Sequence, residues 1–295
     1  MCRHAYLIMA HHDDYLLRSL IQVLDDPRND LYIHMDKKVA SYRQQETERL
    51  ARSSRVIHTK RINVSWGDYT QIEAELILLS TALKIGGYEY YHLISGVDFP
   101  IKSQDEIHDF FHKHEGCEFV QFSSMLSSEI SYRVDSFHLF QHSLGRETIS
   151  RPSVVHIPLW MISKSWSMIQ SKCFPMNMDI KLYKGANWFS ITGDLARYVL
   201  SQQAWIEKVF KHSLNGDEVF LQTIVGNSPF VERLYHAEHD GADEAIMRYI
   251  DWNRGKPYEF TADDLTQIKE SDMLFARKIK PSDKKLIDGL FRYVS

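Results

Sequence analysis

The run from Tyr91 to Ser103 constrains the fold of this chain more than any other segment. It begins as an apolar strand and stops abruptly at Gly96, Asp98 and Pro100. In an open α/β sheet, ligands bind outside the carboxyl ends of the strands, where such turns lie. A strand that ends in this way delivers the Asp98 carboxylate and a rigid turn to that edge. The run therefore predicts an α/β fold with a binding site at this turn.

Strand and helix patterns alternate over the first 120 residues, which is typical of βα units on a mainly parallel sheet. Apolar residues at helical spacing from Ile72 to Leu83 predict one helix, which Gly86 ends. Ser103 and Glu106 have the spacing of a capping box and predict the start of another. The short apolar runs of strand length are 5–10, 31–35, 56–59, 90–95 and 119–122.

The second half of the chain is less regular. Residues 123–178 contain aromatics and serines without a steady period, and we expect helices and loops there. The pattern returns at Lys184, with a strand over 188–191 and helices over 193–200 and around 217–225. No internal repeat or low-complexity linker interrupts the sequence, so we expect a single domain over residues 1–295.

Composition excludes several classes of protein. The chain is 44% hydrophobic and 25% charged, which suits a large core and argues against disorder. A formal net charge of -4 leaves no basic surplus for sequence-independent nucleic-acid binding. Three widely spaced cysteines predict neither a zinc knuckle nor a disulfide framework. The apolar stretch before His11 is too short to span a membrane and has no signal-peptide cleavage pattern, so we expect a cytoplasmic protein.

The tetrapeptide from Asn215 to Glu218 places two carboxylates at a turn that enters a helix. A carboxylate at a helix amino terminus is stabilised in its charged form, which suits a general base. Spacing alone favours a simpler interpretation, in which Asp217 is an N-cap and Glu218 a partner of the helix dipole.

Arg277 and Lys278 follow a short apolar segment near the end of the chain. Such a pair would neutralise a diphosphate, the arginine through its planar fork and the lysine as a point charge. By charge alone, a solvated basic tail is the more common outcome.

No Asp-x-Asp triplet, a common arrangement of two carboxylate metal ligands, occurs in the chain. His34 and Asp36 come nearest to one, but no third ligand has an obvious spacing, so a nucleotide contact from Asp36 is the favoured interpretation. His11 and His12 end the first predicted strand and are expected to be hydrogen-bonded loop residues. Trp66 and Trp188 are expected to pack in the core, with stacking on a sugar or base as the alternative.

Taken together, these segments resemble the core-2/I-branching β-1,6-N-acetylglucosaminyltransferase and peptide O-xylosyltransferase family, glycosyltransferase family 14. The resemblance covers residues 4–122 and 184–280, and the Asp98 turn, the Asp217-Glu218 pair and the Phe275-Ala276-Arg277-Lys278 ending carry it. It implies a GT-A-like α/β fold with a mixed, mainly parallel sheet flanked by helices. Residues 1–122 would form a nucleotide-binding half, and residues 123–295 an acceptor and catalytic half.

The same resemblance implies roles for individual residues. Glu218 would be the general base that deprotonates the acceptor hydroxyl, and Lys278 and Arg277 would contact the diphosphate of the donor. Asn187 stands where one branch of the family has an aspartate, so this chain departs from that branch by lacking a charge at this position. Other donor-site candidates are Arg254, His11, Asp36 and Trp66, and the cleft candidates are Asp98, Asn187, Trp188 and Asp217.

The implied reaction is an inverting transfer from a UDP-sugar, with no metal or other cofactor, that forms a β linkage. The donor sugar would be N-acetylglucosamine or xylose, and the acceptor a glycan, a lipid-linked glycan or a peptide. A microbial enzyme of this kind would work in the cytoplasm or at the inner face of the membrane, with at most peripheral membrane contact. Two other classes stay open: a glycan- or nucleotide-binding protein without turnover, and a metal-dependent phosphohydrolase that uses His34, Asp36 and Asp98.

Overall fold

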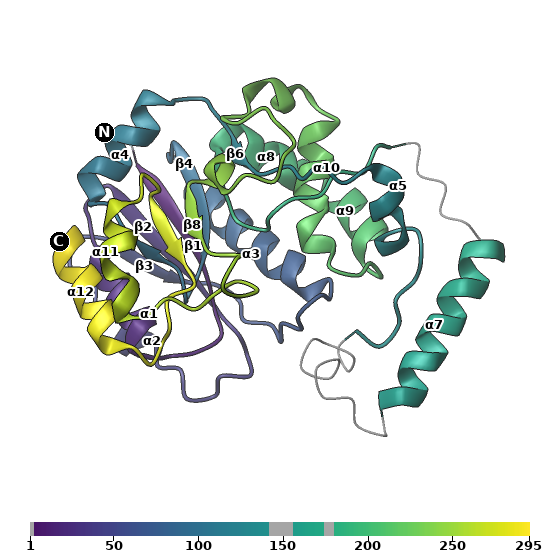
Figure 1. The fold of residues 1–295 in the computed structure, drawn as a ribbon, viewed down its shortest axis with the longest axis horizontal. Coiled ribbons are helices and arrows are strands. Elements are labelled where there is room, and N and C mark those ends of the chain that lie inside the picture. The colour runs from purple at the N-terminus through teal and green to yellow at the C-terminus, as the bar shows by residue number, and fades with distance from the viewer. Residues whose placement is uncertain (1–2, 142–155, 174–179) are drawn as a thin grey trace.

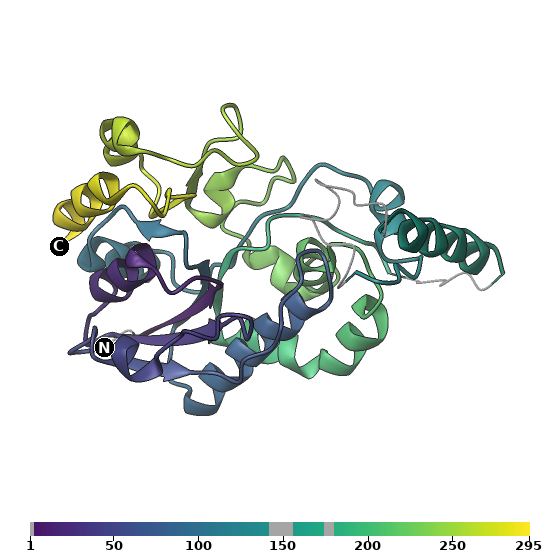
Figure 2. The same cartoon turned by 90° about the horizontal axis from the view of Figure 1, so that it is seen from below.

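The structure, a computed structural model, describes residues 3–141, 156–173 and 180–295. A central six-stranded sheet carries helices on both faces, and a small three-stranded sheet lies beside it. Figures 1 and 2 show these layers, with both chain ends on the same side of the molecule.

Each of the five apolar runs predicted in the first half is a strand in the structure, and the observed strand ends lie within two residues of the predicted ones. The described strands are β1 (His4–Ala10), β2 (Asn29–Met35), β3 (Arg55–His58), β4 (Tyr90–Ser95), β5 (Phe99–Pro100), β6 (Phe119–Val120), β7 (Phe189–Thr192), β8 (Arg248–Ile250) and β9 (Phe275–Arg277).

The helices of the described ranges alternate with these strands in the first half and cluster in the second. The α-helices are α1 (Tyr15–Val23), α2 (Gln44–Glu48), α3 (Thr70–Ile85), α4 (Gln104–Lys113), α5 (Ser127–Ile130), α7 (His156–Cys173), α8 (Gly193–Ser201), α9 (Gln203–Phe210), α10 (Phe220–Gly226), α11 (Leu265–Glu270) and α12 (Lys284–Val294). The short 3-10 helices are η1 (Ser131–Arg133), η2 (Gly216–Glu218), η3 (Pro229–Arg233), η4 (Asp243–Ile246) and η5 (Ala262–Asp264).

The central sheet has the strand order β3-β2-β1-β4-β7-β6. The first four strands are parallel, whereas β7 is antiparallel to both β4 and β6. The predicted fold class, an α/β protein with a mixed and mainly parallel sheet flanked by helices, is therefore confirmed. The position of the run 119–122 after α4 had suggested that it pairs directly with β4. It does not, because β7 from the second half of the chain lies between β4 and β6.

Each face of the sheet has its own hydrophobic core. Tyr6 and Ile8 of β1 point to the face covered by α1, α4 and α12, while Ala5 and Leu7 point to the face covered by α3, α8, α9 and α10. This period of two is the alternation expected of a strand buried on both sides.

Both predicted helix boundaries of the first half are confirmed. Gly86 follows α3 with φ +68°, a backbone conformation that favours glycine. Ser103 caps α4: its hydroxyl accepts the Glu106 N–H at 3.3 Å, and the Glu106 carboxylate accepts the Ser103 N–H at 2.8 Å.

The predicted helix around 217–225 is interrupted. Asn215 has φ +49°, the turn η2 follows it, and Val219 breaks the helical geometry before α10 begins at Phe220. The expected helices and loops of 123–178 are present as α5, η1 and α7 in its described part, and the remainder lies outside the described residues. Among the described helices, none is both long enough and apolar enough to cross a lipid bilayer.

Candidate functional site

Three strand ends and the β9 segment meet at one edge of the sheet. Because β1, β2 and β4 are parallel, the residues that follow them share the carboxyl edge, and these include His11 and Asp36. The backbone joins the loops: Asp36 N–H donates to the Ala10 carbonyl at 2.8 Å, and Gly96 N–H donates to the Met9 carbonyl at 2.9 Å.

Asp98 lies completely buried in the turn after β4. Its carboxylate accepts hydrogen bonds from the Ser95 N–H at 2.8 Å, from the Ser95 hydroxyl at 3.0 Å and from Arg277 Nη1 at 2.5 Å. Asp98 therefore lies at the predicted edge, but its carboxylate holds Arg277 in place and is not open to a ligand.

Arg277 is held from a second direction by Trp188. The guanidinium carbon lies 4.1 Å from the centroid of an indole ring, a distance suited to cation–π attraction. Only 12% of the arginine side chain is exposed. Of the two interpretations of Trp188, packing is the one with a contact in the structure, and the group that packs on it is Arg277.

Lys278, the next residue, lies close enough to His11 to influence its titration. The pKa of His11 is lowered, first by the loss of water around the ring and then by the charges of His12 and Lys278, while Asp36 and Asp14 oppose the shift. The Lys278 backbone N–H donates to the carbonyl of Tyr258 at 3.4 Å. The loops after β1 and β2 therefore share one neighbourhood with Lys278.

Arg248 is a member of this group that the sequence did not single out. It is completely buried, its Nη1 donates to the Ile246 carbonyl at 2.6 Å, and its guanidinium lies 4.4 Å from the ring centroid of Phe275. Burial lowers its pKa to about 10, and the nearby Asp98 carboxylate opposes that shift. A lone arginine in a three-residue strand gives no periodic signal that would have revealed it.

A second group of residues surrounds the turn η2. Glu218 is partly exposed, and its carboxylate accepts a hydrogen bond from Arg133 Nη1 at 2.9 Å and pairs with Lys184 Nζ at 3.4 Å. Two cations therefore contact this carboxylate and fix its direction. Arg133 was missed because it lies in the stretch where the sequence pattern is weakest.

Asp217 does not cap a helix, so the N-cap interpretation was wrong. Its side chain is buried against α3, where Oδ2 accepts a hydrogen bond from Gln71 Nε2 at 3.0 Å. Burial, and then the charge of Glu218, raise the pKa of Asp217 to about 7.

Glu75 on α3 is the second buried acid behind this turn. It is fully buried, and burial followed by the charge of Asp217 raises its pKa well above the ordinary value, while the side chain of Asn187 acts in the opposite direction. Glu73, two residues earlier on the same helix, is only partly buried. The two glutamates differ in burial because the side of α3 that carries Glu75 packs on the sheet.

The segment Lys184–Trp188 joins the two groups. Lys184 pairs with Glu218, the Gly185 N–H donates to the Glu218 carbonyl at 3.0 Å, and Trp188 packs on Arg277. A Cβ atom on Gly185 would lie 1.8 Å from the Gln121 carbonyl oxygen, so this close approach requires glycine.

Trp66 lies beside the η2 turn. It is 45% exposed, and the carbonyl of the following Gly67 accepts the Asn215 N–H at 2.9 Å. Gln71 connects the same loop to the buried acid, because its side chain contacts both the Gly67 N–H and Asp217. Trp66 is thus bound into the loop beside η2, whereas the prediction grouped it with the diphosphate contacts, and its exposure shows that the expected packing in the core was wrong.

Arg254 is engaged by two carboxylates. Its Nε donates to Asp251 at 2.5 Å, its Nη1 donates to Asp264 at 2.6 Å, and its guanidinium lies 4.1 Å from the ring centroid of Tyr258. Since Tyr258 accepts the Lys278 N–H, Arg254 supports the wall behind Lys278.

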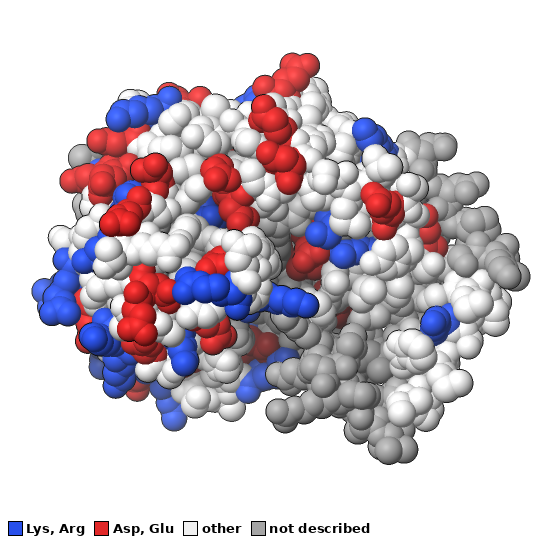
Figure 3. All heavy atoms as spheres, viewed as in Figure 1, with Lys and Arg blue, Asp and Glu red and all other residues white. Residues whose placement is uncertain are grey.

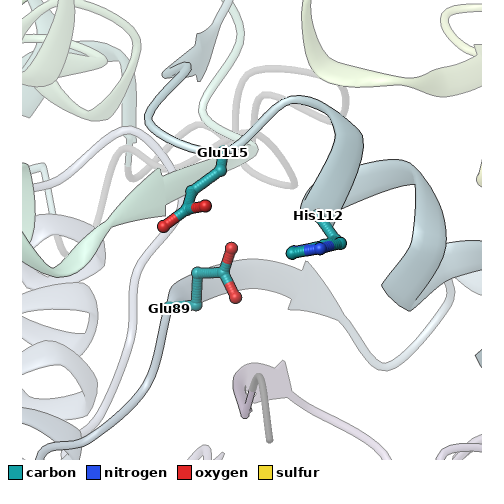
Figure 4. Close-up of side chains that lie close together, drawn as sticks. All are labelled: Glu89, His112 and Glu115. Carbon is teal, nitrogen blue, oxygen red and sulfur yellow. The ribbon is translucent and has the colours of Figure 1, made fainter.

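The histidine of the His34-Asp36 pair is buried in β2, and its Nε2 lies 3.3 Å from the Ile62 N–H that donates to it. Within the described ranges, one group of three metal-ligand side chains lies close together, and it is Glu89, His112 and Glu115, with ligand atoms within 4.8 Å of one another. Figure 4 shows these three side chains turned toward one another. Glu89 precedes β4, so this group lies at the opposite edge of the sheet from His11 and Asp36.

Comparisons of the sequence with a family profile and with known proteins agree with one another. The profile described as Branch, Core-2/I-Branching enzyme, matches residues 4–274. Similar proteins are the beta-glucuronosyltransferase GlcAT14B of Arabidopsis thaliana, 21% identical over 98% of this chain, and the xylosyltransferase oxt of Drosophila pseudoobscura pseudoobscura, 23% identical over 90%. A third is the beta-1,3-galactosyl-O-glycosyl-glycoprotein beta-1,6-N-acetylglucosaminyltransferase of Bos taurus, 23% identical over 93%. The chain spans 65%, 30% and 65% of the lengths of these three proteins.

Proposed function

Because the chain belongs to the Core-2/I-branching enzyme family, we propose that it is a glycosyltransferase that moves a sugar from a UDP-sugar to a hydroxyl group of an acceptor. The observation that carries this proposal is the segment Lys184–Trp188, which contacts a carboxylate held by two cations at one end and a fixed guanidinium at the other. A base and a cationic anion site joined by one segment are what a direct displacement of a diphosphate needs.

In the proposed reaction, Glu218 takes the proton of the acceptor hydroxyl as that oxygen attacks C1 of the donor sugar. The bond from C1 to the diphosphate oxygen breaks on the opposite face, so the configuration inverts and a β linkage forms. Lys278 and Arg277 stabilise the negative charge that develops on the departing UDP. Arg133 and Lys184 hold the Glu218 carboxylate in a fixed direction before the reaction.

We propose that these basic side chains replace a metal ion, so that the reaction needs no cofactor. The donor would be UDP-N-acetylglucosamine or UDP-xylose, and the name of the Arabidopsis relative adds UDP-glucuronic acid. The acceptor would be a glycan, a lipid-linked glycan or a peptide hydroxyl.

A two-step experiment tests this function. Thermal unfolding is first followed with UDP, GDP and CMP, because a ligand that binds only the folded chain raises its apparent stability. UDP release is then measured with each of the three UDP-sugars, with and without simple glycan and serine-peptide acceptors. We expect stabilisation by UDP alone, and acceptor-dependent UDP release from one donor. Stabilisation without any release would indicate a binding protein, and no response to UDP would overturn the proposal.

A further inference from the structure

Helix α7 packs on the rest of the molecule through polar side chains. In Figures 1 and 2 it lies at the outer edge of the molecule, apart from the central sheet. Ser163 and Gln170 are buried, and Ser167 between them donates its hydroxyl hydrogen bond to the Phe137 carbonyl at 2.6 Å. Gln170 Oε1 accepts the Phe137 N–H at 3.0 Å. These three residues have the spacing of a single helix face, so the polar face of α7 is its inner face.

The outer surface of the helix is apolar. A surface helix normally turns its apolar stripe toward the core, and α7 has the reverse arrangement. Met161 is 57% exposed, Ile162 54% and Ile169 55%. The exposed apolar side chains of this surface, the outer face of α7, are Ile157, Trp160, Met161, Ile162, Trp166, Met168 and Ile169.

The charge of this region is one-sided. Although the whole chain carries a net charge of -4, the sequence of α7 contains Lys164 and Lys172 and no aspartate or glutamate. Lys164 is exposed, with its ammonium 4.9 Å from a ring centroid of Trp160. In Figure 3, the surface in the position of α7 is largely white. Basic, tryptophan-containing apolar helix surfaces of this kind lie in the interface of a bilayer.

We propose that the outer face of α7 binds the surface of a bilayer that contains anionic lipids. Its isoleucine and methionine side chains enter the boundary between headgroups and acyl chains, and the tryptophans lie at headgroup level. The exposed Lys164 attracts the lipid phosphates. This charge is what favours an anionic lipid surface over a protein partner as the occupant.

The position of α7 links this surface to the residues around Glu218. Gln170 Nε2 donates to the carbonyl of Asp135 at 3.3 Å, two residues after Arg133, which contacts Glu218. A consequence that rests on the proposed function is that an acceptor carried by the membrane would reach Glu218 from this side. The membrane binding itself does not depend on any activity.

The test is flotation of the full chain with lipid vesicles of two compositions. We expect it to float with vesicles of phosphatidylcholine and phosphatidylglycerol, more weakly at high salt, and least with phosphatidylcholine alone, because screening weakens the attraction of Lys164 to phosphate. The variant Ile162→Glu/Ile169→Glu should bind anionic vesicles at least about tenfold more weakly, since two apolar contacts are lost and two negative charges added. Lys164→Glu should weaken binding to the anionic vesicles only.

The matched control is Ile85→Glu, which places the same charge on an exposed isoleucine at the end of α3. It should float like the unmodified chain, and a cooperative thermal unfolding transition of every variant, measured without ligand, checks that each one is folded. Failure of the unmodified chain to float, or equal flotation of the double variant, would overturn the proposal. A third result would also overturn it: the unmodified chain does not float but forms a concentration-dependent dimer, and the double variant is monomeric. The outer face of α7 would then be a contact between two copies of the chain.

Discussion

Arg277 donates a hydrogen bond from Nη1 to the carboxylate of Asp98 at 2.5 Å, across 179 residues of sequence. Asp98 is wholly buried, and Trp188 packs on the guanidinium from the side, so Arg277 has a fixed position before any ligand binds. Because the carboxylate balances part of the arginine charge, we expect Lys278 to supply much of the attraction for a diphosphate.

Lys278→Ala should weaken UDP binding by about one to two decades. Removing one charge-assisted contact costs on the order of 1.5 to 3 kcal/mol. The rate of sugar transfer should fall as well, because the charge on the diphosphate grows as the glycosidic bond breaks. Calorimetric titration with UDP measures the first effect, and single-turnover kinetics measures the second.

Lys284→Ala is the control for this experiment, since Lys284 begins α12 and lies over the ring of Tyr15. Equal UDP affinity in the unmodified chain and both variants would mean that Lys278 belongs to a solvated surface. The diphosphate site would then have to be sought around Arg254 and Lys256.

Glu218→Gln should keep donor binding and lower turnover by about 10² to 10⁴, the usual contribution of one positioned general base. The amide retains an oxygen that can accept from Arg133 but has no carboxylate to take a proton. Glu207→Gln, on an exposed carboxylate of α9 that pairs with Lys211, is the control. A Glu218→Gln variant with most of its activity would remove Glu218 from the catalytic role.

Transferase activity should survive EDTA, because the proposed mechanism stabilises the leaving diphosphate with Lys278 and Arg277. The measurement is UDP release with and without the chelator, using the His112→Ala variant to remove the surface group of Glu89, His112 and Glu115. Loss of activity in EDTA with recovery in manganese, in both proteins, would restore His34 and Asp36 as metal ligands.

Asp217 should make the folded state less stable as pH rises. Its folded pKa is about 7 against an ordinary value of 3.8, so between these values the folded chain holds a proton that the unfolded chain has released. The free energy of unfolding therefore loses this contribution as pH rises through about 4 to 7, by roughly 2 to 4 kcal/mol. Glu75, whose pKa is raised in the same way, adds to the trend.

Asp217→Asn tests this titration. The difference in unfolding free energy between the variant and the unmodified chain should shift in favour of the variant as pH rises through that window, as followed by urea denaturation. The buried His4 and His92, whose lowered pKa values give the opposite slope, are common to both proteins and cancel in the difference. Parallel curves for Asp217→Asn would contradict the burial of a protonated Asp217.

Gly185→Ala should destabilise the fold by at least about 2 kcal/mol, because an added methyl group would overlap the Gln121 carbonyl and displace the segment that carries Trp188. Gly193→Ala at the start of α8 is the control, since its added Cβ would meet other atoms at 3.4 Å or more. Equal thermal stability of the two variants would mean that the Lys184–Trp188 segment tolerates displacement.

Local periodicity was enough to predict the strands of the first half, the stop of α3 at Gly86 and the capping box at Ser103. Each of these features depends on residues within a few positions of one another, where backbone conformation and side-chain alternation are decided locally. The residues of the short motifs and their order along the chain were also enough to indicate the family. This information can be read from the sequence without knowing which motifs are in contact.

Tertiary structure alone decided which residues surround those motifs. Glu75 became a buried acid because its side of α3 packs on the sheet, and Asp217 faces it although 142 positions separate the two in the printed sequence. Arg133 reaches Glu218, and Asp98 reaches Arg277, only because the chain folds back through β7 and β9. Burial and charge pairing between distant residues have no local signal, because they depend on which surfaces the folded chain removes from water.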